Sequence, residues 1–346
     1  MKEDDEFREQ QRRPKTVFLN AARLDFDHTL SFERLAKVTD LTLYDKVDNL
    51  TTVSSILEHI PTNTEIIITK EMEIPMEAFH EFPSSVKLLC EAGTGYNNLP
   101  VDEARKKNVL VCNVPTYSTE SVAHLAITYM MNFSCSMFGQ QRLLEKSNDR
   151  INFKGPFTLP LHELGGKTLG LIGGSGEIGS KVADIALALG MNIVISSRKG
   201  SLPSDHRHYH NNRVRVVTKL EDLMPLSDYV SIHCPLNEET KKSIDGRLIR
   251  LMKSNAYLIN TARGGIINEI ELIECLKENV IAGAGLDVTD GEPPSDDSEL
   301  WTLDNCILTP HIGWRRQETR QRLLDMTIDN IENYIEGNPS NVVNKI

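Results

Sequence analysis

The sequence has no CxxC spacing, no long apolar run and no excess of basic residues. Its six cysteines lie far apart, which disfavours a disulfide framework and a zinc site and indicates reduced, mostly buried thiols. No apolar run reaches the roughly 18 residues of a membrane span, and the first 15 residues, "MKEDDEFREQQRRPK", lack the apolar core of a secretory signal. The formal net charge of −11 disfavours nucleic acid or an anionic membrane as partner. We therefore expect a cytoplasmic protein with a small-molecule ligand.

The length of 346 residues and the order of apolar runs indicate two domains. Residues 1–15 read as a disordered, charged tail. Four short apolar runs follow, at 15–21, 64–70, 86–93 and 109–114, with longer segments between them. This alternation predicts a parallel sheet with crossover helices.

A long segment with helical periodicity separates the two halves of the sequence. Residues 118–146 carry apolar side chains at helical spacing and predict one long connecting helix. Residues 147–167 are polar and rich in proline and glycine, so they predict a loop or arm.

A second series of apolar runs lies at 168–173, 192–197, 228–234, 255–260, 281–288 and 306–310. Helical patterns separate them, as at 180–190 and 269–280. The series predicts a doubly wound sheet of about six strands, the type that binds dinucleotides.

The stretch "TLGLIGGSGEIGSKVADIALALG" carries a glycine-rich turn between the first of these strands and a helix. Gly174, Gly176 and Gly179 form G-x-G-x-x-G, which lets the backbone turn tightly, approach a pyrophosphate and pack the helix on the sheet. Such turns also occur for packing alone, but the strand, the helix and the following sheet all favour dinucleotide binding.

The next strand ends in Ser197, Arg198 and Lys199 instead of the acid that usually binds the ribose hydroxyls of NAD. Hydroxyl and cationic groups suit a 2′-phosphate, so we expect NADP, with NAD as the alternative. The following His206, His208 and His210 are each two residues apart. On a strand this spacing would place the three imidazoles on one face, where they could bind a metal. Their polar surroundings favour a solvated loop, and no metal is expected.

Three later strands end near a reactive side chain. Arg263 follows the run at 255–260, Asp287 and Glu292 lie at and after 281–288, and His311 follows 306–310. Ligands of open parallel sheets bind beyond the carboxyl ends of the strands. A histidine there can protonate the oxygen of a keto acid during hydride transfer, an acid can orient the ring, and an arginine can bind the substrate carboxylate.

Several motifs together resemble the D-isomer-specific 2-hydroxyacid dehydrogenase family. They are "AGTGYNN" (92–98), "VPTYSTESVA" (114–123), "INTARGGIINE", "GLDVTDGEPP", "LTPHIGW" and "NVVN". The resemblance covers nearly the whole chain after the tail, and within the family it is strongest to the glycerate dehydrogenase and hydroxypyruvate or glyoxylate reductase branch.

The resemblance implies two Rossmann-like, doubly wound parallel-sheet domains with a cleft between them. Residues 16–118 and 314–346 would form the substrate domain and residues 119–313 the dinucleotide-binding domain. The arm at about 134–165 would form a homodimer. Arg263, Glu292 and His311 would be the catalytic trio, Thr94 and Gly95 would present backbone amides to the substrate carboxylate, and Asp287 would receive the nicotinamide carboxamide.

Trp314 lines the substrate pocket in one interpretation and packs at the domain junction in the other. The complete set of expected cofactor contacts is Gly174, Gly176, Glu177, Ile178, Gly179, Ser197, Arg198, Lys199, Cys234, Thr261, Ala262, Arg263, Asp287, His311 and Gly313.

The chain departs from the family pattern at four places. An additional glycine, Gly173, precedes the motif, and Glu177 stands where arginine is common. Asn268 replaces a frequent aspartate, and "FKGPF" replaces a G-x-W pattern in the arm. These departures concern the cofactor site and the arm rather than the trio.

We therefore expect an NADP-preferring reductase of small 2-keto acids, or the reverse oxidation. The alternative is a dinucleotide-sensing protein similar to the corepressors of the family. A formate dehydrogenase is disfavoured, because that branch has glutamine where Glu292 stands.

Overall fold

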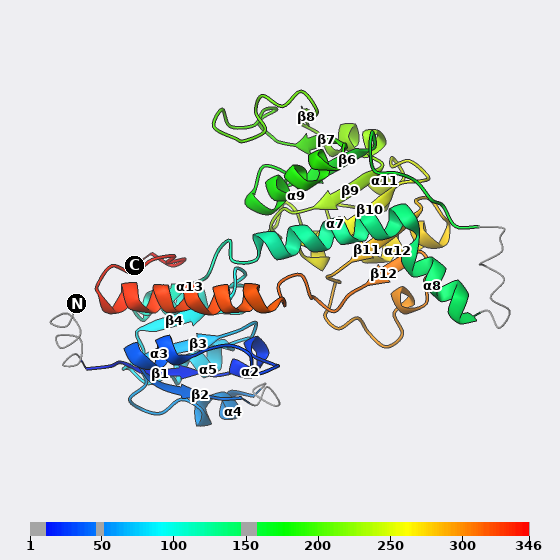
Figure 1. Ribbon diagram of the computed structural model, residues 1–346. Coiled ribbons are helices and arrows are strands. Elements are labelled where there is room, and N and C mark those ends of the chain that lie inside the picture. Colours follow the sequence, from blue (N-terminus) through cyan, green and yellow to red (C-terminus); the bar gives the residue numbers. More distant parts are fainter. Residues whose placement is uncertain (1–11, 46–51, 147–157, 346) are drawn as a thin grey trace. The chain divides into compact units, whose positions relative to one another are not determined.

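The computed structural model describes residues 12–45, 52–146 and 158–345. The chain divides into two compact units (Figure 1). Unit 1 comprises Met1–Tyr117 and Arg316–Ile346, and unit 2 comprises Ser118–Arg315. The expected division of labour, with substrate on one unit and dinucleotide on the other, stays a prediction.

Unit 1 contains a five-stranded parallel sheet with the order β2-β1-β3-β4-β5. The strands are β1 (Lys15–Phe18), β2 (Asp40–Leu43), β3 (Ile66–Thr69), β4 (Leu88–Glu91) and β5 (Leu110–Cys112). Both β3 and β4 are buried throughout, which explains why each begins with three apolar residues. The sequence did not predict β2, because "DLTL" lies at the sheet edge and carries two polar residues that leave the run short.

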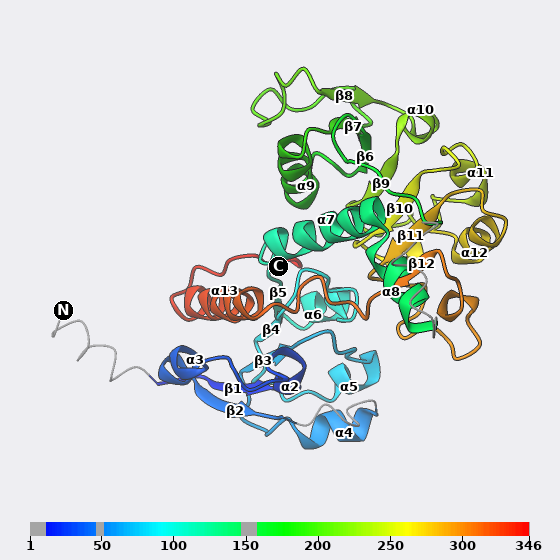
Figure 2. The ribbon, with the colours of Figure 1, turned by 45° about the vertical axis from the view of Figure 1, so that its right-hand side comes forward.

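Short helices connect these strands, and one long helix from the other end of the chain completes the unit. They are α2 (Ala21–Leu24), α3 (Glu33–Val38), α4 (Val53–Glu58), α5 (Met76–His80), α6 (Val101–Lys106) and α13 (Gln317–Ile335). In both views α13 lies along the sheet of unit 1 beside α3 (Figures 1 and 2). Its buried Arg320 donates to Asp27 at 2.8 Å, and this bond is the main cause that lowers the pKa of Asp27 to about 2. The C-terminal helix α13 is thereby attached to the segment that follows α2.

Unit 2 contains a seven-stranded parallel sheet with the order β12-β11-β10-β9-β6-β7-β8. The strands are β6 (Thr168–Ile172), β7 (Asn192–Ser196), β8 (Val214–Val217), β9 (Tyr229–Ile232), β10 (Tyr257–Asn260), β11 (Gly283–Leu286) and β12 (Cys306–Leu308). The predicted fold class, two doubly wound parallel-sheet domains, is confirmed. The additional strand β8 was missed, because "VRVV" is short, places an arginine between its valines and follows a polar segment.

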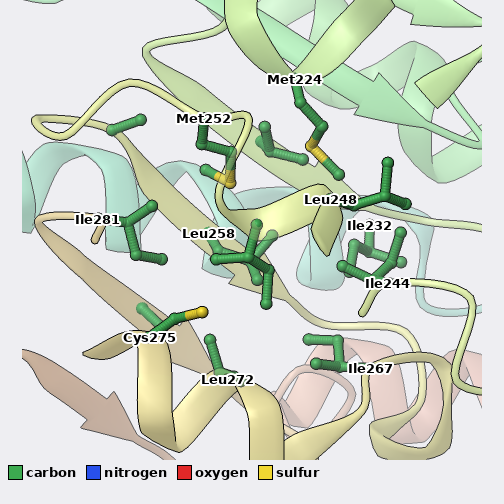
Figure 3. Close-up of a cluster of buried hydrophobic side chains, with 14 of the residues drawn as sticks. Met224, Ile232, Ile244, Leu248, Met252, Leu258, Ile267, Leu272, Cys275 and Ile281 are labelled. Atoms are coloured by element: carbon green, nitrogen blue, oxygen red, sulfur yellow. The ribbon is translucent and has the colours of Figure 1, made fainter. Parts of the chain in front are cut away.

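Helices cover both faces of this sheet (Figure 2). An apolar core lies between the sheet and the helices on each face. The helices are α7 (Thr119–Cys135) and α9 (Glu177–Ala188) on one face, and α10 (Leu220–Leu223), α11 (Gly246–Ile249) and α12 (Glu269–Lys277) on the other. Alternate residues of β6 divide between the cores: Leu169 and Leu171 face α7 and α9, whereas Ile172 faces the opposite core. Figure 3 shows that second core, in which Leu258 of β10 lies among side chains such as Leu272 and Cys275 of α12.

The predicted long helix over 118–146 is wrong in one respect, because it is two helices. The first is α7, which ends at Cys135, and the second is α8 (Met137–Lys146). Ser136 between them has a left-handed backbone, with φ of 49°, and its hydroxyl donates to the carbonyl of Pro160 at 2.5 Å. The apolar periodicity continues across this residue, so the sequence pattern does not reveal the break.

Parts of the predicted tail and arm lie outside the described residues, namely 1–11 and 147–157, which include "FKGPF". Residue 15, placed in the tail by the sequence, is the first residue of β1. All six cysteines are free, and Cys90, Cys112, Cys275 and Cys306 are buried. Within the ranges that the structure describes, no helix is long and apolar enough to cross a membrane.

Candidate functional site

The turn between β6 and α9 is shaped by glycines that approach other backbone segments. Gly173 has a φ of +84°, and a β-carbon there would lie 2.6 Å from the backbone nitrogen of Cys234. A β-carbon on Gly179 would lie 2.6 Å from the carbonyl oxygen of Gly173. At Gly176 the nearest atom would be 3.5 Å away, which is an ordinary contact. The tight turn is thus made at Gly173, one residue before the predicted motif, while Gly179 allows the helix to pack on the turn.

The N-terminus of α9 is open toward this turn. The helix begins at Glu177, and its N-cap residue Gly176 has no side chain that could cap the first N–H groups. The first N–H groups of a helix have no partner within the helix and carry a partial positive charge, so they suit a phosphate. Glu177 places a carboxylate on this turn, but Arg207 lies 3.7 Å from it and offsets the charge. Ile178 packs against the core and fixes the first turn of the helix.

Two buried polar atoms at the carboxyl ends of β9 and β10 have no hydrogen-bond partner within the described chain. They are Nδ1 of His233 and Oγ1 of Thr261, which follow directly after the paired residues Ile232 and Asn260. Burial lowers the pKa of His233 to about 4, so the ring is neutral at physiological pH. Burial also raises the pKa of the neighbouring Cys234 thiol. Polar atoms of this kind need a partner, and together with the glycine turn they fit a bound dinucleotide.

The residues expected to bind the adenosine end follow β7. The Arg198 guanidinium lies 2.5 Å from a carboxylate oxygen of Glu239, and both side chains are exposed. Ser197 donates its hydroxyl to the carbonyl of Ser201 at 3.0 Å, and Lys199 is exposed. Two cationic side chains, those of Arg198 and Lys199, thus lie exposed after the end of β7.

The segment with alternating histidines forms turns rather than a strand, and it packs on α9. His206 hydrogen-bonds to the Ser180 hydroxyl at 2.9 Å, and His208 lies 2.9 Å from Asp184. His208 is only 6% exposed, so the predicted solvated loop is wrong at this residue. His210 instead packs its ring against Tyr209, and the three rings therefore do not converge. Across the residues that the structure describes, no group of three or more potential ligands could hold a metal.

Glu292 and His311 lie together, as predicted. Nδ1 of His311 is 2.7 Å from Oε2 of Glu292, and both side chains are partly exposed. His311 has a left-handed backbone, with φ of 50°, which costs free energy for a residue other than glycine. Its backbone N–H donates to the carbonyls of Asp287 and Thr309, at 3.0 and 2.9 Å, and so holds this conformation.

Asp287 supports the turn that carries His311. Its buried carboxylate accepts hydrogen bonds from the backbone N–H groups of Ile312 and Gly313, both at 2.8 Å, and from the Thr309 hydroxyl. Burial raises the pKa of Asp287, and these donors oppose the shift. This supporting role was missed from the sequence, because the bonds join residues more than 20 positions apart. Contact of Asp287 with a nicotinamide stays a prediction.

Arg263 lies at the end of β10, in a turn fixed by its neighbours. Asn260 donates to the Arg263 carbonyl at 2.9 Å and accepts from the Ala262 N–H at 3.0 Å. A β-carbon on Gly264 would lie 1.9 Å from the backbone of Thr289, so this turn packs directly on the chain leaving β11. The exposed guanidinium donates to the carbonyl of Ala262 and to neither Glu292 nor His311. The trio thus comes from the ends of three adjacent strands, with one bonded pair.

The three predicted substrate residues lie in different units. Thr94 and Gly95 belong to a loop of unit 1, in which the Thr94 hydroxyl donates to the Val114 carbonyl at 2.9 Å and its carbonyl accepts from Asn113 at 2.7 Å. The backbone N–H groups of Thr94 and Gly95 make no hydrogen bond to the described part of the chain. Trp314 is buried in unit 2, 3% exposed.

Comparisons with known proteins agree with this geometry. The family model described as "D-isomer specific 2-hydroxyacid dehydrogenase, NAD binding domain" matches residues 127–313. The hydroxypyruvate reductase of Blautia hydrogenotrophica is 33% identical over 91% of this chain and 95% of its own length. The glycerate dehydrogenase of Methylorubrum extorquens is 30% identical over 87% of this chain and 91% of its own length.

Solved structures of NAD(P)-binding reductases and dehydrogenases have folds similar to that of this chain. An acyclic imino acid reductase in complex with NADPH and D-Arg is 27% identical, with a TM-score of 0.79 over 95% of this chain and 99% of that one. A D-lactate dehydrogenase from Aquifex aeolicus, complexed with NAD and lactic acid, is 25% identical, with a TM-score of 0.79 over 96% and 99%.

The glycine turn generates a matched pair of variants. We expect Gly173→Ala to lower the free energy of unfolding by about 2 kcal/mol or more, because the methyl group meets the backbone after β9 at a left-handed residue. Gly176→Ala has room in the protein, so we expect unchanged stability but at least tenfold weaker binding of the dinucleotide, whose pyrophosphate needs close approach. Urea unfolding and fluorescence titration with NADPH measure the two effects. Equal stability losses in both variants would contradict this assignment of the two glycines.

Proposed function

The chain belongs to the D-isomer-specific 2-hydroxyacid dehydrogenase family, and from this membership we propose that it reduces hydroxypyruvate, glyoxylate or a similar small 2-keto acid with NADPH. The resemblance noted in the sequence is confirmed. As a member of the family the chain is an NAD(P)-dependent oxidoreductase that transfers a hydride between the nicotinamide and a 2-keto or D-2-hydroxy acid. Its named relatives are reductases and dehydrogenases, so the corepressor-like alternative is not favoured.

The observation that carries the mechanism is the bond between His311 and Glu292. When bound, NADPH supplies the hydride that adds to the carbonyl carbon of the substrate. The carbonyl oxygen gains negative charge in this step and must receive a proton. Glu292 accepts from Nδ1 of His311 at 2.7 Å, which orients the ring so that Nε2 can point to the substrate. Nε2 of His311 is then the acid that protonates the oxygen, and in the oxidation the same atom takes the proton back.

Charge complementarity supports a role in substrate binding for Arg263 and for the N–H groups of Thr94 and Gly95. The exposed guanidinium of Arg263 binds the substrate carboxylate and polarises the carbonyl. The N–H groups of Thr94 and Gly95, which have no partner among the described residues, form a second carboxylate-binding element on unit 1.

Variants of the trio test both the activity and the mechanism. We expect His311→Ala and Arg263→Ala each to lower kcat/KM for hydroxypyruvate by about 10³-fold or more, and Glu292→Gln by about 10²-fold, since the proton donor, the carboxylate ligand and the orienting acid are removed in turn. The oxidation of NADPH at 340 nm measures the rates, with glyoxylate as a second substrate.

His124→Ala is the matched control, because His124 also lies near a glutamate, 3.8 Å from Glu120, but on the surface of α7. It should retain the wild-type rate, and all variants should keep their melting temperature. Wild-type turnover in the His311→Ala variant would refute the assigned acid, and no turnover of either keto acid by the wild-type protein would refute the proposed substrates.

We propose NADPH as the preferred cofactor because Arg198 and Lys199 follow β7 where an acid would bind NAD. The bond of Arg198 to Glu239 joins two exposed side chains and contributes little, so a phosphate can replace it. We expect Arg198→Ala to raise KM for NADPH about tenfold and to leave KM for NADH within twofold. Arg247→Ala is the control, since Arg247 makes a similar exposed pair with Glu221 in the same unit. Equal effects on both cofactors would refute phosphate recognition by Arg198.

We propose that the protein is a homodimer through the region where α7 meets α8. Large apolar side chains are exposed there, including Met131, Met137 and Leu161. Exposed apolar groups gathered in this way commonly mark an interface. We expect Met137→Asp to convert the dimer to a monomer in sedimentation velocity, whereas Met76→Asp, at another exposed methionine in unit 1, should leave it dimeric. A wild-type monomer at micromolar concentration would refute the proposal.

We also propose a cytoplasmic location. All six cysteines are free, and the four buried ones form no disulfide, as expected in a reducing compartment.

A further inference from the structure

Besides Arg320 of α13, two charged side chains that the proposed mechanism does not use are completely buried among the described residues of unit 1. Lys70 follows β3 and is 1% exposed, and Glu91 ends β4 and is 0% exposed. Lysine and glutamate are almost never fully buried unless they are paired, because removal of the charge from water costs free energy. Their position therefore requires a reason beyond the packing of the sheet.

Glu91 is surrounded by hydrogen-bond donors. Its Oε1 accepts from the backbone N–H of Glu71 at 2.8 Å, and its Oε2 accepts from the Thr69 hydroxyl at 2.8 Å and from the Asn98 amide at 3.0 Å. Burial raises the pKa of Glu91, but every one of these partners donates and so favours the carboxylate. The bond to Asn98 also ties together the two ends of the loop 92–98.

Lys70 and Glu71 form the other half of the cluster. Nζ of Lys70 lies 2.8 Å from Oε1 of Glu71, and Arg23 donates to the other carboxylate oxygen, at 2.9 and 3.1 Å. Glu71 has a left-handed backbone, with φ of 52°. A residue other than glycine is held in this conformation only when its surroundings determine it strongly, and such strain is concentrated at functional sites.

Both buried charges lie against one residue of the loop 92–98. A β-carbon on Gly93 would stand 3.1 Å from Oε1 of Glu91 and 3.5 Å from Nζ of Lys70. The next two residues are Thr94 and Gly95, whose backbone N–H groups have no partner in the chain as described. The buried ammonium group thus lies beside Gly93, the residue that precedes these two N–H groups.

We propose that Lys70 is a positioning residue that strengthens the binding of the substrate carboxylate at the N–H groups of Thr94 and Gly95, and that Glu71 attenuates this effect. The proposal rests on the proposed function, which places a carboxylate at this loop. A buried charge acts over a longer range than an exposed one, because water and salt screen it less. Lys70 therefore adds positive potential at the loop. The Glu71 carboxylate 2.8 Å from it removes part of that potential, and so does the buried Glu91 carboxylate beside Gly93.

Opposite changes of KM distinguish this role from a purely structural one. We expect Lys70→Met to raise KM for hydroxypyruvate about tenfold, with kcat and KM for NADPH within twofold of the wild type, and Lys70→Arg to restore most of the affinity. Glu71→Gln leaves Lys70 with its charge less compensated, so we expect KM to fall about threefold. A structural role predicts that loss of the Lys70–Glu71 bond disturbs the loop in either variant, and hence that KM does not fall.

Lys106→Met is the matched control, since Lys106 is an exposed lysine of unit 1 that also pairs with a glutamate. The inhibition constant of oxalate, a dicarboxylate that accepts no hydride, should follow the same order as KM. An unchanged KM in folded Lys70→Met, or a raised KM in Glu71→Gln, would overturn the proposal.

Two further outcomes are decided by other measurements. If Lys70→Met does not fold, the fall in KM of Glu71→Gln decides alone. If the wild-type protein reduces neither keto acid, the proposed function fails, and calorimetric binding of oxalate to the wild type and Glu71→Gln decides on Lys70 separately.

Discussion

The carboxylate of Asp287 holds the part of the structure on which the chemistry depends. Asp287 follows directly after the buried strand β11, and its carboxylate accepts hydrogen bonds from the turn at residues 309–313, which follows β12. These bonds keep His311 in a left-handed conformation and bring its ring to Glu292. A site built in this way is preorganised, since the imidazole and its orienting carboxylate already lie at bonding distance. The short parallel strands in turn fix where Asp287 stands.

Much of the fold could be predicted from the sequence, because buried parallel strands leave a strong local signal. The apolar runs that became β3 and β10 are wholly buried, and each follows the expected alternation with helices. The local apolar pattern failed to predict elements whose formation depends on contacts with distant parts of the chain. The edge strands β2 and β8 lack continuous apolar runs, and Ser136 breaks a helix whose periodicity continues beyond it. At Gly173 the motif itself misled, because only the approach of the chain after β9 shows which glycine makes the turn.

The candidate site likewise contains residues that the sequence predicted and residues that it did not. His311 and Glu292 were predicted, since their motifs are local and the chemistry of the residue types is specific. The supporting role of Asp287 and the cluster of Lys70 and Glu91 were not, because each depends on contacts between segments distant in sequence. Glu91 reaches the backbone 20 positions before it, and a glutamate or a lysine at the end of an apolar run predicts a solvated strand end. Only the topology, which places β3 beside β4, shows that both are buried.

The net charge of −11 makes the binding of anions the central electrostatic problem of this protein. Both the dinucleotide and a keto acid are negative, and the average field of the chain repels them. The structure offers the same kind of element on each unit: backbone N–H groups at the start of α9 on unit 2, and those of Thr94 and Gly95 on unit 1. Such dipoles are fixed, do not titrate and attract anions without adding a full charge. One cation near each element then suffices, and a buried one such as Lys70 is screened less by salt than the exposed Arg198. The part of keto-acid binding that Thr94, Gly95 and Lys70 provide should accordingly depend less on ionic strength than discrimination between NADPH and NADH does, because the first depends on fixed dipoles and a buried charge and the second on an exposed guanidinium.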